Sequence, residues 1–331
     1  MKFSQMISAL SFHAQNRMAC GIVGAPGVGK SEGVFQVAAD VMPAAPVIVM
    51  NLGLSDQTDG KGLPFMVTDE RGRFVQWVKD QRLPTDTPIV LFLDEYFQAS
   101  TPVQATFASM ILEKRIDDLY LHPDSWVVFA SNRMEDKAGT NRTPSHVPNR
   151  CTILHGPDVD SEDWSEWALL HGQPIELIQF LRMRSGLLHD WDSNRMINAT
   201  PRQWAAVGTM INAGIPDDIR FDCFSGRVGE GPTAELIGFL KIAAQLPPKE
   251  QILMNPKTAP VPEDPSALYA VTGMLAKAAT VNNFENVVTY MDRTPPEFQA
   301  MLVKDVMKTT PGVTSTKAFV KWGVKFAEVL R

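Results

Sequence analysis

The chain has 331 residues, of which 44% are hydrophobic and 21% are charged. This composition excludes a disordered or fibrous chain, and the length is enough for about two domains of roughly 100 to 200 residues each. The formal net charge of −6 gives no general attraction to nucleic-acid phosphates or anionic lipids. No window approaches the ~18 consecutive apolar residues that span a bilayer. We therefore expect a cytoplasmic protein with no membrane insertion and no general affinity for nucleic acid.

Short apolar runs alternate with helical patterns in the first half of the chain, as in a parallel sheet covered by helices. An amphipathic helix is expected around residues 6–12. Each apolar run is apolar enough for a strand buried on both faces of a sheet. The runs are residues 18–23, 47–51, 89–93 and 126–130, with 151–154 as a candidate fifth strand. Residues 63–67 and 74–78 flank a turn-like sequence and predict a β-hairpin inserted on the sheet.

Helical periodicity replaces the strand signals after about residue 156. The clearest helical segments are residues 161–170, 201–211 and 233–244. A proline-rich stretch at 247–265 interrupts them and is expected to lead to a final helical block that ends with residues 317–330. The predicted fold class is thus α/β, with helices on both faces of a parallel sheet, followed by an all-α part. The predicted domains are an α/β domain at 1–158, a helical domain at 159–246 and a C-terminal helical extension at 247–331.

A phosphate-binding loop follows the first predicted strand, because residues 24–31 fit G-x-x-x-x-G-K-S/T at every specified position. The loop consists of Gly24, Ala25, Pro26, Gly27, Val28, Gly29, Lys30 and Ser31. Glycines let backbone N–H groups converge on phosphates, and the following helix directs its positive end at the same anion. Lys30 is expected to reach the outer phosphates, and the Ser31 hydroxyl to coordinate Mg²⁺. The loop alone leaves ATPase, GTPase and small-molecule kinase open.

Two carboxylates end the strand predicted at residues 89–93, since Asp94 and Glu95 follow it directly. In parallel α/β sheets, ligands bind at the carboxyl ends of the strands. We expect Asp94 to hold the magnesium ion through a water, and Glu95 to act as general base toward the attacking water. The alternative is an acidic N-cap of the next helix.

A neutral amide follows the strand predicted at residues 126–130, in the sequence Ser131-Asn132-Arg133. We expect Asn132 to orient water against the terminal phosphate. An asparagine after a strand is otherwise an ordinary turn residue, so this role depends on the other motifs.

Taken together, these motifs resemble the MoxR-like branch of the AAA+ ATPases over roughly residues 1–205. The matches are to the family's Walker A, Walker B, following helix and sensor 1, at residues 24–31, 93–95, 104–115 and 131–133. Residues 55–64 are similar to the segment that begins the family's helix-2 insertion hairpin. The resemblance implies an AAA+ core with a lid domain, hydrolysis of ATP with Mg²⁺, and nucleotide bound between neighbouring subunits of a ring, usually a hexamer.

The resemblance also implies two arginines that act on the nucleotide. Arg150, in Pro148-Asn149-Arg150, matches the position of the arginine that reaches across the subunit interface and stabilises charge on the transferred phosphoryl group. Arg142 is a nearby alternative. Arg202, after Pro201, looks like the family's sensor 2 at the start of a lid helix, where proline suits the first turn. The alternative for each is an ordinary solvated arginine.

These features favour a ring-forming ATPase that remodels or matures a protein partner, and the resemblance implies a von Willebrand A domain protein as that partner. One alternative is a nucleic-acid-associated AAA+ module such as a helicase loader, for which a basic face is expected. The other alternative, a small-molecule kinase, fits poorly with Asn132, Arg150 and Arg202 in AAA+ order.

Overall fold

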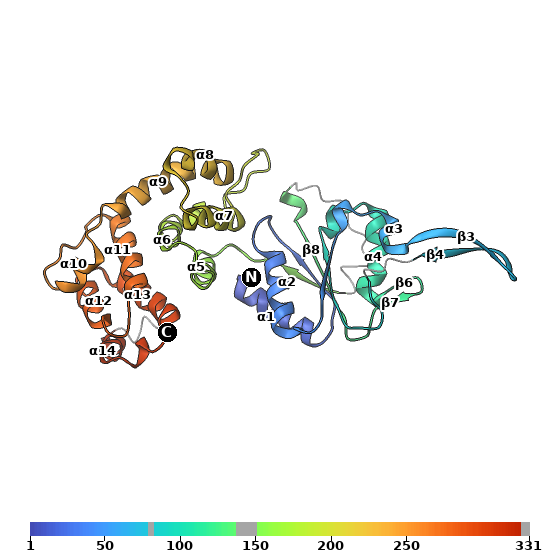
Figure 1. The fold of residues 1–331 in the computed structure, drawn as a ribbon, viewed down its shortest axis with the longest axis horizontal. Coiled ribbons are helices and arrows are strands. Elements are labelled where there is room, and N and C mark those ends of the chain that lie inside the picture. The colour runs from blue at the N-terminus through green and yellow to red at the C-terminus, as the bar shows by residue number, and fades with distance from the viewer. Residues whose placement is uncertain (79–82, 137–150, 326–331) are drawn as a thin grey trace. The chain divides into compact units, whose positions relative to one another are not determined.

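The computed structural model describes residues 1–78, 83–136 and 151–325. They form two compact units. The first comprises the described part of Met1–Val159 together with Asp192–Asn194, and the second comprises Asp160–Trp191 and the described residues from Arg195 onward. The first unit is an α/β structure on a parallel sheet and the second is helical (Figure 1). The predicted fold class is therefore confirmed.

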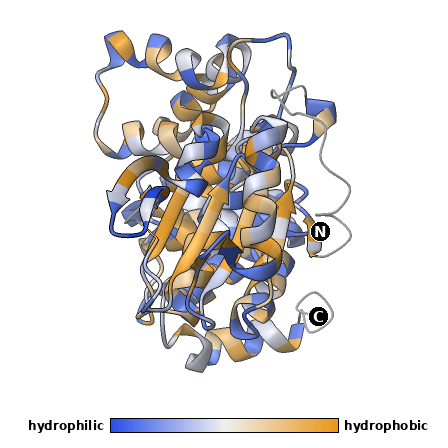
Figure 2. Ribbon diagram, turned by 90° about the vertical axis from the view of Figure 1, so that its right-hand side faces the viewer, coloured by the Kyte–Doolittle hydropathy of each residue, from blue (hydrophilic) through white to orange (hydrophobic). Residues whose placement is uncertain are grey.

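Five parallel strands form the centre of the first unit, in the order β2-β5-β8-β1-β9. They are β1 (Cys20–Val23), β2 (Val47–Asn51), β5 (Val90–Asp94), β8 (Trp126–Ser131) and β9 (Thr152–His155). Each coincides with one of the five apolar runs of the sequence, and Figure 2 shows their hydrophobic colouring. Because all pairings are parallel, the carboxyl ends of the strands lie along one edge of the sheet.

Helices cover both faces of this sheet. They are α1 (Phe3–Gln15), α2 (Lys30–Val41) and α4 (Thr101–Glu113). Residues of α1 and α2 share one hydrophobic core with Val90 and Phe92 of β5, and residues of α4 share the other with Leu91 and Leu93. Side chains of a strand point alternately to its two faces, so β5 contributes to both cores.

Strand β2 departs from the expectation of burial on both faces. Val47 and Val49 are 36% and 47% exposed, whereas Met50 is 5% exposed. β2 is an edge strand, and Ile48 and Met50 pack into the core that contains α4. Its other face is exposed at the edge of the sheet, which an apolar run alone does not reveal.

The predicted hairpin is present and extends away from the rest of the first unit (Figure 1). It consists of β3 (Leu63–Asp69) and β4 (Gly72–Val78), paired antiparallel, and follows α3 (Gln57–Lys61). The remaining short elements of this unit are η1 (Leu52–Leu54), η2 (Tyr96–Gln98), β6 (Arg115–Ile116), β7 (Leu119–Tyr120) and η3 (Met134–Asp136). Six apolar side chains of the hairpin are about half exposed or more: Leu63, Phe65, Met66, Val75, Trp77 and Val78.

The second unit is built from helices. They are α5 (Ser161–Leu170), α6 (Ile175–Met183), α7 (Pro201–Asn212), α8 (Asp217–Val228), α9 (Glu230–Ala244), α10 (Lys249–Met254), α11 (Pro265–Ala278), α12 (Phe284–Met291), α13 (Pro296–Thr309) and α14 (Lys317–Lys325), with the short helices η4 (Ser185–Leu187) and η5 (Val313–Ser315). The proline-rich stretch contains α10, which follows Pro248, and ends where Pro265 begins α11. Pro265 thus lies in the first turn of a helix, as the fixed φ of proline allows, and Pro248 is the N-cap of another.

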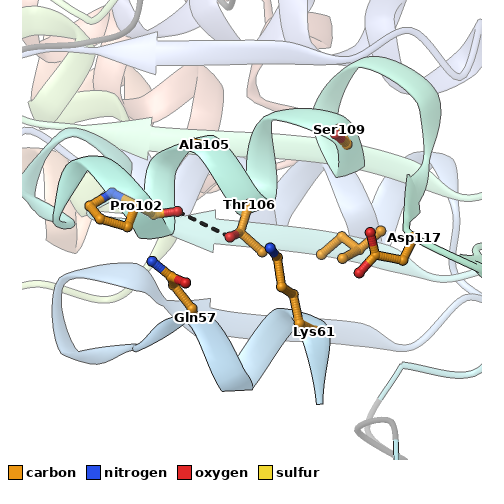
Figure 3. A pocket seen from close by; sticks show the side chains of 8 residues that line it. Gln57, Lys61, Pro102, Ala105, Thr106, Ser109 and Asp117 are labelled. Carbon is orange, nitrogen blue, oxygen red and sulfur yellow. Dashed lines mark hydrogen bonds between the residues drawn. The ribbon is translucent and has the colours of Figure 1, made fainter. Parts of the chain in front are cut away.

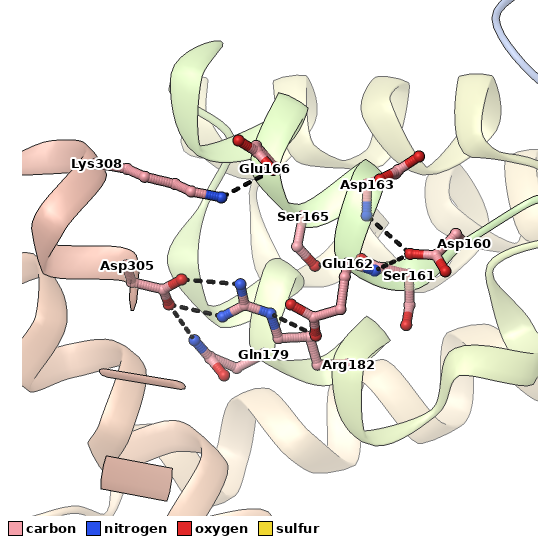
Figure 4. A network of polar contacts seen from close by, with 10 residues as sticks. All are labelled: Asp160, Ser161, Glu162, Asp163, Ser165, Glu166, Gln179, Arg182, Asp305 and Lys308. Atoms are coloured by element: carbon pink, nitrogen blue, oxygen red, sulfur yellow. Dashed lines mark hydrogen bonds and ion pairs between the residues drawn. The ribbon is translucent and has the colours of Figure 1, made fainter. Parts of the chain in front are cut away.

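A buried ion pair joins α6 to α13 in the second unit (Figure 4). Arg182 donates to both carboxylate oxygens of Asp305, at 2.6 and 2.8 Å, and the two side chains are 5% and 2% exposed. Gln179 also donates to Asp305, at 3.4 Å. Lys308 pairs with Glu166 of α5 at 2.8 Å. Helices on both sides of residue 246 thus contact one another, and the division of the helical part at that residue stays a prediction.

Across residues 1–78, 83–136 and 151–325, no helix combines the length and the apolar character needed to cross a membrane.

Candidate functional site

The phosphate-binding loop connects β1 to α2, and its backbone curl depends on glycine. Gly27 and Gly29 have φ angles of 74° and 90°, in the left-handed region that side chains rarely adopt. Gly29 is the N-cap of α2, so Lys30 and Ser31 are the first two residues of the helix. The backbone N–H groups at this end have no partner within the helix, and the helix dipole adds positive charge. This is the geometry of an anion site.

The Lys30 side chain forms hydrogen bonds with oxygen atoms of residues that follow two different strands. Its Nζ donates to the carbonyl oxygens of Gly24 and Ala25, at 2.8 and 2.7 Å, and to Oδ1 of Asn132, at 2.9 Å. The lysine is 8% exposed. Since β8 lies next to β1 in the sheet, the residue after β8 reaches the loop after β1. The structure therefore brings Asn132 to the loop lysine, while its role toward water stays a prediction.

The acidic pair ends β5 beside the loop. The Ser31 hydroxyl donates to Oδ2 of Asp94 at 3.3 Å, and the Glu95 amide donates to Oδ1 of Asp94 at 2.9 Å. Glu95 has a φ of 56°, in the left-handed region, which is uncommon for a residue with a side chain and concentrates at functional sites. The contacts bring together Lys30, Ser31, Asp94 and Asn132 from three adjacent segments.

The oxygen donors beside the loop suit a hard cation. Ser31 and Asp94 contribute a hydroxyl and a carboxylate, which are the donor types that Mg²⁺ prefers. Among the described residues, there is no group of three or more His, Cys, Asp or Glu side chains that could hold a metal ion. A magnesium ion at Ser31 and Asp94 would therefore need phosphate oxygens and water as its other ligands, which is its usual coordination beside nucleotides.

Ser131 connects the two motifs, although the sequence analysis assigned a role in that strand end to Asn132 alone. Its hydroxyl donates to Oε1 of Gln98 at 2.7 Å and accepts from the Phe97 amide at 3.1 Å, and its carbonyl accepts from the Gly24 amide at 3.2 Å. Ser131 thus fixes the segment after Glu95 and the start of the loop to the same strand end. The available signal was its place after an apolar run, as the first residue of the motif at 131–133.

Gly156, after β9, is a second residue that sequence reasoning missed. Its amide donates to the Val23 carbonyl at 2.6 Å. A Cβ built on Gly24 would lie 2.9 Å from Cα of Gly156, and a Cβ built on Gly156 would lie 2.9 Å from Cα of Gly24. The two backbones are therefore in direct contact where the loop begins.

Of the arginines predicted to act on the nucleotide, Arg202 is the one that lies among the described residues. Arg150 and Arg142 lie outside the described residues. Arg202 is the second residue of α7 in the second unit, after Pro201 and the N-cap Thr200, whose side chain accepts from the Gln203 amide. Its position at a helix start agrees with the sequence, and its role stays a prediction. Arg133 pairs with Asp136, and this hydrogen bond raises the pKa of its guanidinium.

A groove of about 330 Å³ lies between α3 and α4, at the base of the hairpin (Figure 3). Gln57 and Lys61 of α3 face Thr106 of α4 across it. The groove shares no residue with the phosphate-binding loop or the acidic pair, and the sequence did not point to it.

No protein-family model and no curated protein matches the chain. Similar solved structures include a lysine-to-arginine mutant of RuvB from Thermotoga maritima, with a TM-score of 0.40, 17% identity and coverage of 82% of this chain and 80% of that one. NtrX from Brucella abortus in complex with ADP has a TM-score of 0.43 and 13% identity, with 99% and 68% covered. A proposed ATPase from Cytophaga hutchinsonii has a TM-score of 0.35 and 14% identity, with 92% of this chain and 80% of that one covered. Similarity of this degree does not assign an activity to the chain.

Proposed function

We propose that the chain is a magnesium-dependent ATPase of the AAA+ class and of the MoxR-like type, which works as a ring on a protein partner. One observation carries the proposal. The phosphate-binding loop, the Asp94-Glu95 pair and Asn132 meet at one edge of the sheet, through contacts of Lys30 with Asn132 and of Ser31 with Asp94. Phosphoryl transfer depends chiefly on positioning and charge stabilisation, and these groups supply both.

Each residue of the cluster has a chemical role in this proposal. The loop amides and Lys30 bind the phosphates, and Ser31 and Asp94 hold Mg²⁺. A bound magnesium ion would neutralise part of the phosphate charge. Glu95 accepts the proton of the attacking water, and Asn132 orients that water. Glu95 has a left-handed backbone, and its amide donates a hydrogen bond to Oδ1 of Asp94, which fixes the backbone of the acidic pair.

The ring and its arginines extend the proposal beyond a single chain. The family resemblance supports a homo-oligomer, usually a hexamer, in which Arg150 or Arg142 of one subunit reaches the nucleotide of its neighbour. Arg202 would respond to the γ-phosphate from the lid. An arginine supplied in this way accelerates phosphoryl transfer by roughly 10³-fold or more.

The exposed hairpin supports a protein as the partner. Its strand pairing places Leu63, Phe65 and Val78 on one face, and Met66 and Trp77 on the other, so both faces carry apolar side chains. An isolated two-stranded hairpin is marginally stable in water, and exposed apolar patches mark interaction sites. A von Willebrand A domain protein is the partner that the resemblance favours.

Replacement of Glu95 by glutamine tests the proposal. Glu95→Gln keeps the shape of the side chain but cannot accept a proton, so we expect steady-state ATP turnover to fall about 10²- to 10⁴-fold. ATP binding, measured by titration with a fluorescent analogue, should remain. Glu113→Gln, at an exposed carboxylate paired with Arg115, is the matched control and should leave turnover unchanged.

Two further measurements complete the test. Chelation of Mg²⁺ should abolish turnover by the wild-type chain, and the Glu95→Gln protein held with ATP should form a larger assembly that retains its client during purification. Unchanged turnover by Glu95→Gln would show that Glu95 is not the general base.

A further inference from the structure

The short helix η1 lies against the residue proposed as the general base. It follows β2, which pairs with β5 so that Asn51 is opposite Asp94. Leu52 of η1 is fully buried in the same hydrophobic core as Tyr96 and Phe97, the two residues after Glu95. The burial of these side chains fixes η1 beside the Glu95 backbone.

Gly53, the central residue of η1, leaves no room for a side chain. A Cβ built on it would lie 2.6 Å from Oε2 of Glu95, 3.2 Å from Oδ1 of Asn51 and 3.4 Å from Cβ of Glu95, whereas real Cβ atoms essentially never approach a heavy atom within 3.0 Å. The Gly53 amide donates to Oδ1 of Asn51 at 3.0 Å, which holds its backbone in place. Its φ is outside the left-handed region, so alanine suits the backbone itself. The Glu95 carboxylate is the nearest group, and of the three contacts its distance alone is under 3.0 Å, so it occupies the space that a side chain at position 53 would need.

We infer that Gly53 is a positioning residue, whose bare backbone forms the surface against which the Glu95 carboxylate lies. The inference rests on the proposed role of Glu95 in water activation. A methyl group at position 53 would displace Oε2, which is the free end of a flexible side chain, so the carboxylate moves while the fold stays intact. The displacement changes the geometry of proton transfer without changing the groups that hold the phosphates.

Gly53→Ala should therefore separate catalysis from binding. We expect kcat to fall by about 10- to 100-fold, since a shift of about 1 Å in a catalytic group has effects of this size. The Kd for ATP should stay within about two-fold and the melting temperature within a few degrees, because Lys30 and the loop are unchanged. Gly186→Ala is the matched control. Gly186 is also the central residue of a three-residue helix, η4, and a Cβ built on it meets nothing within 4 Å.

A double variant tests whether Gly53 acts through Glu95. Glu95→Asp shortens the side chain by one methylene and withdraws the carboxylate from position 53. In that background, measured by single-turnover hydrolysis, Gly53→Ala should lower the rate by less than about three-fold, because the two sites are coupled. An equal loss in both backgrounds, an unchanged kcat of Gly53→Ala, or a loss of ATP affinity would each overturn the inference.

The outcomes also separate this inference from the proposed function. If Glu95→Gln abolishes turnover and Gly53→Ala does not lower it, the ATPase proposal stands and the positioning role is wrong. If Glu95→Gln leaves turnover unchanged, the proposed role of Glu95 itself is wrong.

Discussion

Two buried cations, one in each unit, have different surroundings. Arg182 faces both oxygens of Asp305 across two helices, at 2.6 and 2.8 Å. Lys30 instead donates to two main-chain carbonyls of its own loop and to the amide oxygen of Asn132. The arginine fork is matched by a carboxylate of complementary geometry, whereas the lysine stands at the start of a helix within a loop of left-handed glycines.

The contact of Arg182 with Asp305 stabilises the fold, whereas the contacts of Lys30 hold it where a ligand would bind. Removing either partner of a buried bidentate pair leaves an uncompensated charge in the interior. The loss of such a pair therefore lowers the free energy of unfolding. A lysine at an anion-binding loop contributes its charge to the ligand. Its loss therefore lowers the rate of hydrolysis. We therefore expect each cation to affect one kind of measurement and leave the other nearly unchanged.

Replacement of Lys30 should act on activity. Lys30→Ala removes the side chain proposed to bind the outer phosphates, and ATP hydrolysis should fall by at least about 100-fold, as for loss of one preorganised donor. The melting temperature should stay within a few degrees, since the hydrogen bonds lost are those of a single side chain. Steady-state hydrolysis and thermal unfolding check both parts. A Lys30→Ala protein with a much lower melting temperature but normal ATP hydrolysis below it would show that Lys30 serves stability instead.

Asp305→Ala should act on stability. It leaves the buried Arg182 with only the exposed carboxylate of Glu162, 3.7 Å away, and should destabilise the second unit by about 3 to 5 kcal/mol. Hydrogen exchange in α6 and α13, together with denaturant unfolding, measures this loss. The double variant Arg182→Met with Asp305→Leu removes both charges and should recover most of it, since apolar replacement of a buried pair is often neutral. If the double variant is as unstable as the single one, the charge is not the cause.

Replacement of Lys308 should have little effect, because its ion pair is exposed to solvent. Its pair with Glu166 has a similar distance, 2.8 Å, but the side chains are 37% and 53% exposed. Solvent screens such pairs, so Lys308→Ala should change the free energy of unfolding by less than about 1 kcal/mol. Denaturant unfolding of this variant beside Asp305→Ala gives the difference directly. A loss comparable to that of Asp305→Ala would mean that distance, rather than burial, sets the energy.

Much of the first unit follows from local sequence. The five apolar runs became the five strands, and the glycines of the loop have the backbone angles that the motif requires. Since motif residues follow strand ends, parallel pairing together with the order β5-β8-β1 brings Asp94 and Asn132 to Lys30 and Ser31. The order of the strands decides which ends are adjacent, and no local pattern encodes that order.

What could not be predicted depends on contacts between distant residues. Arg182 and Asp305 lie on two helices whose polar residues look like ordinary surface positions in the sequence, and only the helix arrangement buries them. The exposure of Val47 follows from the edge position of β2 rather than from its composition. Gly53 carries no motif, and its importance appears only when a Cβ is placed beside Glu95.

The contact between Gly24 and Gly156 has a consequence for the evolution of related chains. Main-chain atoms face each other from both sides, and they cannot rotate away as a side chain can. A larger residue at either position therefore requires a backbone shift where the loop begins, and no single substitution at the other position relieves it. In an alignment of homologues, both positions should be invariant glycine, and an exception at one should coincide with an altered loop.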